Sequence, residues 1–143
     1  MLKSKLQFTN LTIGISVVIL FAITGQLMRH YYHNSEAPDV ERLYRRSRHL
    51  FLLLAGLTQG GIGIYIQAYT HRLSYLLQWL ATGLMSLASA FLILAFFYEI
   101  PDAIIETPLS RLAMYLLLAS IVLHFVGGLL NRYQESKNIL PKN

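Results

Sequence analysis

The feature that most constrains this chain is a set of four long stretches that contain no Asp, Glu, Lys or Arg. They cover residues 6–28, 49–71, 73–98 and 112–131, and they are 23, 23, 26 and 20 residues long. A helix of about 20 apolar residues crosses the ~30 Å hydrocarbon core of a bilayer, so each stretch is long enough to do so. A soluble globular enzyme is therefore excluded.

These stretches predict an all-α integral membrane protein with four transmembrane helices in an antiparallel bundle joined by short loops. We expect one membrane domain over residues 1–143, with spans near residues 7–29, 49–70, 74–98 and 108–131. The first stretch is longer than the apolar core of a signal peptide, and no small-residue cleavage pattern follows it, so we expect it to be retained. Thr107 is a suitable N-cap for the last span, and Pro108 suits its first position.

Charge offers only a weak guide to orientation. Four spans place both termini on one side, and the 12 Lys and Arg residues divide equally between the two sides. Every lysine is on the terminal side, however, and six of the seven acids are on the other. We expect a multi-pass protein of the cytoplasmic (inner) membrane with cytoplasmic termini.

Small and polar residues mark the faces that should pack inside the protein. Gly56, Gly60 and Gly63 recur at helical spacing, which is typical of close helix packing in membranes, and Gly60→Leu is expected to push the helices apart. A second set near mid-bilayer depth comprises Gln59, Ser86 and Ser120, which are expected to form a polar layer in the bundle interior. An unpaired amide in hydrocarbon costs several kcal/mol, so Gln59 should face inward, bonded to another helix or to a quinone, substrate or ion.

Histidines are the residues on which cofactor binding depends. His124 is the only ionisable side chain well inside a span, and it could bond a neighbouring helix, bind a cofactor or metal, or relay protons. On the opposite side, His30, His49 and Arg46 could hold a haem with its propionates or a copper ion, or contact lipid headgroups. There is no two-histidine helical metal motif, so the sequence leaves any metal unknown.

Three short segments between Gly25 and Ile66 resemble the small four-span membrane proteins grouped around a bacterial protoporphyrinogen oxidase. They are HYYH after the first span, ERLYRR before the second and GGIGIYI late in the second. That family has a histidine inside its first span and a lysine in its third, and both are missing here. We therefore transfer neither its activity nor its site residues to this chain.

The expected function is that of a small non-enzymatic accessory, assembly or stabilising subunit of a membrane complex. The chain has no cysteine, which excludes disulfides, thiolate metal sites and thiol nucleophiles. Its net charge of +5 is attributed to lipid headgroups and not to nucleic acid, so the expected partners are the lipid bilayer and other membrane subunits or a second copy. No cofactor is predicted under this interpretation. The alternative is a redox membrane protein that binds haem b or a quinone through histidines between its helices.

Overall fold

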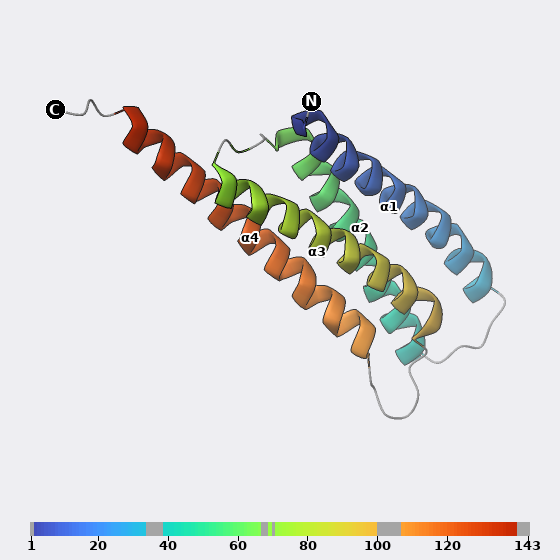
Figure 1. Cartoon of the computed structure of the whole chain (residues 1–143). Helices are drawn as coiled ribbons and strands as arrows, with labels where there is room; N and C mark the ends of the chain where they lie inside the picture. The colour runs from blue at the N-terminus through green and yellow to red at the C-terminus, as the bar shows by residue number, and fades with distance from the viewer. Residues whose placement is uncertain (1, 34–38, 67–68, 70, 100–106, 140–143) are drawn as a thin grey trace.

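The structure is a computed structural model that describes residues 2–33, 39–66, 69, 71–99 and 107–139. Within these residues it is entirely helical and contains four long helices (Figure 1). They are α1 (Leu2–His33), α2 (Asp39–Tyr65), α3 (Arg72–Tyr98) and α4 (Pro108–Ile139). α1 begins and α4 ends at the same end of the molecule, which we call the terminal end (Figure 1).

The ends of the helices follow local sequence chemistry. α4 begins at Pro108, whose fixed φ and missing N–H suit a first helical position. α2 begins ten residues before the second charge-free stretch, and Asp39 and Glu41 in its first turn interact favourably with the positive end of the helix dipole. α2 ends at Tyr65, before the end of the second predicted span.

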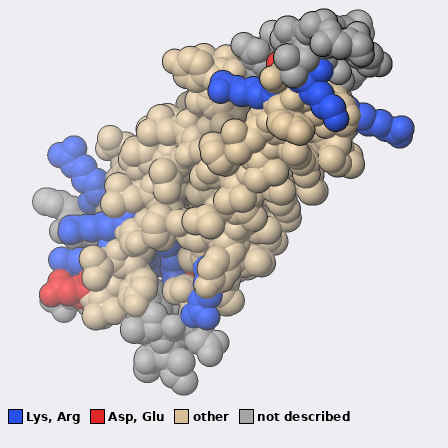
Figure 2. Space-filling view, turned by 90° about the vertical axis from the view of Figure 1, so that its left-hand side faces the viewer, with Lys and Arg blue, Asp and Glu red and all other residues tan. Residues whose placement is uncertain are grey.

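Three of these helices are long and apolar enough to cross a membrane, at Lys5–His30, Arg72–Tyr98 and Pro108–Lys137. α2 does not reach the same apolarity, because Gln59 and four glycines lie within its uncharged part. The described part of the chain is therefore all-helical with three candidate membrane spans, as in a membrane protein. Its surface in Figure 2 has a broad band free of Lys, Arg, Asp and Glu, with charged side chains gathered at the two ends.

The helices pack as two antiparallel hairpins placed side by side. α1 packs extensively on α2, and α3 packs equally extensively on α4 (Figure 1). The two hairpins meet along a narrower seam, mainly between α2 and α3 with a smaller contact between α1 and α3, and in the described residues α4 packs far more on α3 than on the first hairpin. Small residues line much of this interior, and the core contains Val17, Leu52, Ala55, Met85, Ala88, Leu92, Phe96, Ala113 and Leu117.

Glycines explain why α1 and α2 approach so closely. A Cβ atom added to Gly14 would lie 2.4 Å from the backbone nitrogen of Gly60, and one added to Gly63 would lie 2.6 Å from that of Leu11. Gly56 also faces α1, whereas a Cβ on Gly60 would meet no atom within 4 Å. Gly60 thus enters the contact through its backbone. That Gly60→Leu separates the helices stays a prediction, while a Cβ added at Gly14 or at Gly63 would meet the backbone of the other helix directly.

Candidate functional site

The buried amide of Gln59 lies in the seam between the two hairpins. Its Nε2 donates to Ser86 Oγ at 2.9 Å, and its Oε1 lies 3.1 Å from the Oγ of Ser89, which donates to it. Each serine is also within bonding distance of a carbonyl of α3, Ser86 of Thr82 and Ser89 of Met85. The structure therefore brings Gln59 and Ser86 together and adds Ser89, which the sequence analysis did not single out.

Two further polar contacts join α3 to its other neighbours. Ser120 lies apart from Gln59, and its Oγ donates to the backbone carbonyl of Ala81 at 2.8 Å, linking α4 to α3. Asn10 in α1 donates to Thr82 Oγ1 at 3.2 Å. Such bonds hold membrane helices together because hydrocarbon offers their polar groups no other partner.

The His49 side chain packs against α1. Its ring stacks on Phe21 with centroids 4.0 Å apart, and its Nδ1 lies 3.2 Å from Thr24 Oγ1. His30 and Arg46 are exposed on α1 and α2. No hydrogen bond or ring contact in the described part of the chain joins these two residues to His49, and a haem or copper site among the three stays a prediction.

A buried ion pair at the loop end of the molecule, opposite the terminal end, joins three helices. Arg48 of α2 is almost completely buried, donates to the backbone carbonyl of Glu99 and lies 3.5 Å from the Glu99 carboxylate. The same carboxylate accepts the backbone N–H of Leu109 and the hydroxyl of Ser110, both at 2.5 Å. Glu99, at the end of α3, therefore caps the first turn of α4.

This ion pair stabilises the packing of α2 against the end of α3 and the start of α4. The sequence analysis assigned neither this ion pair nor this cap. Burial lowers the pKa of Arg48, and the Glu99 carboxylate opposes that shift. A guanidinium stays protonated in proteins, so Arg48 keeps its charge and needs this partner.

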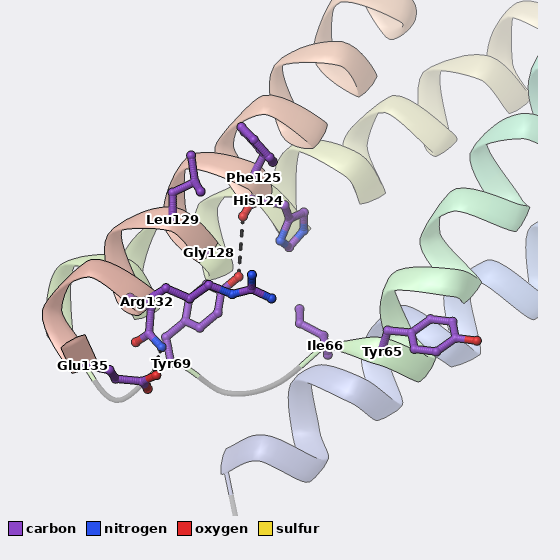
Figure 3. Close-up of a pocket in the computed structure, with 10 residues that line it drawn as sticks. Tyr65, Ile66, Tyr69, His124, Phe125, Gly128, Leu129, Arg132 and Glu135 are labelled. Carbon is purple, nitrogen blue, oxygen red and sulfur yellow. Dashed lines mark hydrogen bonds between the residues drawn. The ribbon is translucent and has the colours of Figure 1, made fainter. Parts of the chain in front are cut away.

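The cavity that remains open to a ligand lies at the terminal end, between α4 and the chain segment that follows α2 (Figure 3). Its volume is about 480 Å³. Its lining residues are Tyr65, Ile66, Tyr69, His124, Phe125, Gly128, Leu129, Asn131, Arg132 and Glu135. The cavity thus combines polar groups, namely an imidazole, a guanidinium, a carboxylate, an amide and two phenols, with apolar side chains of which Phe125 and Leu129 come from α4.

His124 lies at this cavity without the expected bond to another helix. Its Nε2 atom is buried and has no hydrogen-bond partner among the described residues. Only the backbone carbonyl of His124 is engaged, by the Tyr69 hydroxyl at 3.5 Å (Figure 3). Gly128 makes room for that phenol, because a Cβ there would lie 2.9 Å from the Tyr69 oxygen. The imidazole is therefore the one inward polar group at this cavity that the fold does not use.

Arg132 and Glu135 are exposed at the water side of the same cavity. The Glu135 carboxylate accepts a hydrogen bond from Asn131 at 2.9 Å, while Figure 3 shows the His124 ring and the Arg132 side chain both extending from α4 into the space beside Tyr69. The described residues contain no group of three or more His, Cys, Asp or Glu side chains placed to hold a metal ion. The charged groups of the cavity are thus one guanidinium, Arg132, and one carboxylate, Glu135, of which the carboxylate is already bonded to Asn131.

Comparison of the chain with protein-family models, with curated proteins and with solved structures gave no match.

Proposed function

We propose that the protein is a four-span integral membrane protein of the cytoplasmic membrane with both termini on the cytoplasmic side. The support lies in the uncharged part of α2, where several of the residues that lower its apolarity are buried against neighbouring helices. Gln59, Gly56 and Gly63 are buried. The outward residues of the same stretch include Leu50, Leu54, Leu57 and Ile64, which are between 48% and 62% exposed. The surface that α2 would turn toward lipid is thus apolar.

Topology reporters test this arrangement directly. Fusions after Arg72 and after Asn143 should report the same side, and a fusion after Asp39 should report the opposite side. If α2 stays on one side of the membrane, the fusions after Asp39 and Arg72 will agree. That result would exclude four spans.

Within the membrane we propose a non-enzymatic role as an accessory or stabilising subunit of a membrane complex. The observation that supports it is how the buried polar residues are used. Gln59, Ser120 and Arg48 each bond another helix, so the polar groups that could have formed a reaction centre hold the fold together instead. We expect crosslinking in intact membranes to give one stoichiometric membrane partner, whose amount falls when this chain is deleted. A chain that stays monomeric, with deletion leaving every membrane complex unchanged, would contradict this role.

The second candidate is a redox protein that binds haem b or a quinone, and it depends on the unpaired Nε2 of His124. Haem ligation by two histidines would need a second imidazole across the gap, and His124 is the one histidine among the residues that line the cavity. An absorption spectrum of the purified protein separates the two candidates. A stoichiometric Soret band that disappears in His124→Gln would replace the subunit proposal with the redox one.

A further inference from the structure

We propose that the cavity at the terminal end is a binding site for an anionic phospholipid, with Arg132 contacting the headgroup phosphate and His124 donating from Nε2 to an ester carbonyl of the same lipid. This goes beyond the proposed subunit function and does not depend on it.

Charge at the terminal end supports an anionic ligand. The described side chains there include the exposed cations Lys5, Arg72, Arg132 and Lys137, against one acid, Glu135. Basic pockets between membrane helices at an interface select anionic headgroups, and a guanidinium can bind two phosphate oxygens at once. Arg132 is the cation of this group that lines the cavity.

Depth supports a lipid in preference to a free anion. His124 and Arg132 are two helical turns apart, which is ~12 Å along the axis of α4 at ~1.5 Å per residue. Arg132 is exposed at the end of the span, whereas the Nε2 of His124 is buried. The site therefore runs from the aqueous interface into the bilayer, as a phospholipid does with its phosphate outside its ester groups.

The inner polar group of the cavity, the His124 imidazole, fits an ester carbonyl of a lipid. The imidazole of His124 can donate from Nε2 when its proton is on that atom, and the buried position keeps water from competing. Phe125 and Leu129 on the same helix are 66% and 51% exposed and give the acyl chains an apolar path. A small water-soluble phosphate would leave both His124 and this apolar wall unused.

Native mass spectrometry of the full-length protein in detergent tests the proposal, with phosphatidylglycerol and phosphatidylcholine of identical acyl chains as probes. We expect phosphatidylglycerol to bind at least about fivefold more tightly, and Arg132→Gln to remove that preference. Lys137→Gln is the matched control, because it removes an exposed cation at the same end of α4 that does not line the cavity. It should change binding by less than about twofold.

A second pair of variants tests the proposed hydrogen bond between His124 and the lipid ester carbonyl. His124→Leu should weaken phosphatidylglycerol binding about two- to tenfold, the range for one hydrogen bond, and His124→Gln should restore much of it because its amide reaches a similar position. Thermal unfolding of each variant shows that the fold is kept. Equal binding of the two lipids, an unchanged Arg132→Gln variant, or displacement of the lipid by millimolar inorganic phosphate or a short-chain quinone would each overturn the proposal.

Discussion

Gly14→Ala is the substitution that most directly tests the contact between α1 and α2. The new methyl group would lie 2.4 and 2.6 Å from the backbone nitrogen and Cα of Gly60, whereas ordinary contacts between such atoms are ~3.5–4.0 Å. The obstacle is backbone, which cannot rotate away, so the helices must separate locally by ~1 Å. Overpacking of this kind costs ~1–3 kcal/mol. The better helix propensity of alanine returns up to ~1 kcal/mol, which leaves a net loss of ~0–2 kcal/mol when that gain is complete.

Gly61→Ala is the matched control in the same helix pair. A Cβ at Gly61 meets no atom within 4 Å, so this variant gains helix propensity without a clash and should be unchanged or more stable by up to ~1 kcal/mol. The difference between the two variants is the measured quantity, because the propensity gain is common to both. Reversible unfolding in mixed detergent micelles should separate them by ~1–3 kcal/mol. If Gly14→Ala is as stable as Gly61→Ala, the close approach of α1 to Gly60 is refuted.

Two further substitutions test the buried polar groups by the same unfolding measurement. Glu99→Gln leaves Arg48 buried without a countercharge and should cost about 3 kcal/mol, whereas Glu41→Gln, which breaks a partly exposed pair within α2, should cost less than ~0.5 kcal/mol. Equal losses would mean that the Arg48–Glu99 pair is solvated. Gln59→Leu should cost only about 1 kcal/mol, since both serines that it contacts keep a carbonyl of their own helix as partner. A loss above about 3 kcal/mol would show that the serines depend on the amide.

The sequence predicted the helical class and the main segments because the physics behind them is local. A run without charges and a proline after a capping residue are both visible within a few positions. Gln59 could also be placed, since an amide among apolar residues has few alternatives to facing another helix. Its partner Ser89 could not be chosen over Ser120, because that choice depends on how α2 and α3 are rotated and shifted relative to each other.

The features that the sequence analysis missed join distant parts of the chain. Gly14 looks like any glycine in an apolar helix, and its importance follows from the position of Gly60 opposite it. The capping of α4 by Glu99 depends on the path between α3 and α4, so Thr107 was the natural choice from local rules. The stacking of His49 on Phe21 likewise depends on how α2 is rotated against α1.

The narrow seam between the two hairpins has a consequence for how the protein is made and how it moves. Each hairpin buries most of its interface within itself, so α1 with α2 and α3 with α4 can each form as a pair before the two pairs meet. Specific contacts across the seam must then fix the axial register of one hairpin relative to the other. The hydrogen bonds between Gln59 and the two serines Ser86 and Ser89 fix this register, because an axial shift of one helical turn, ~5.4 Å, would break both. If the assembled protein flexes, the seam is the plane along which its halves would shear.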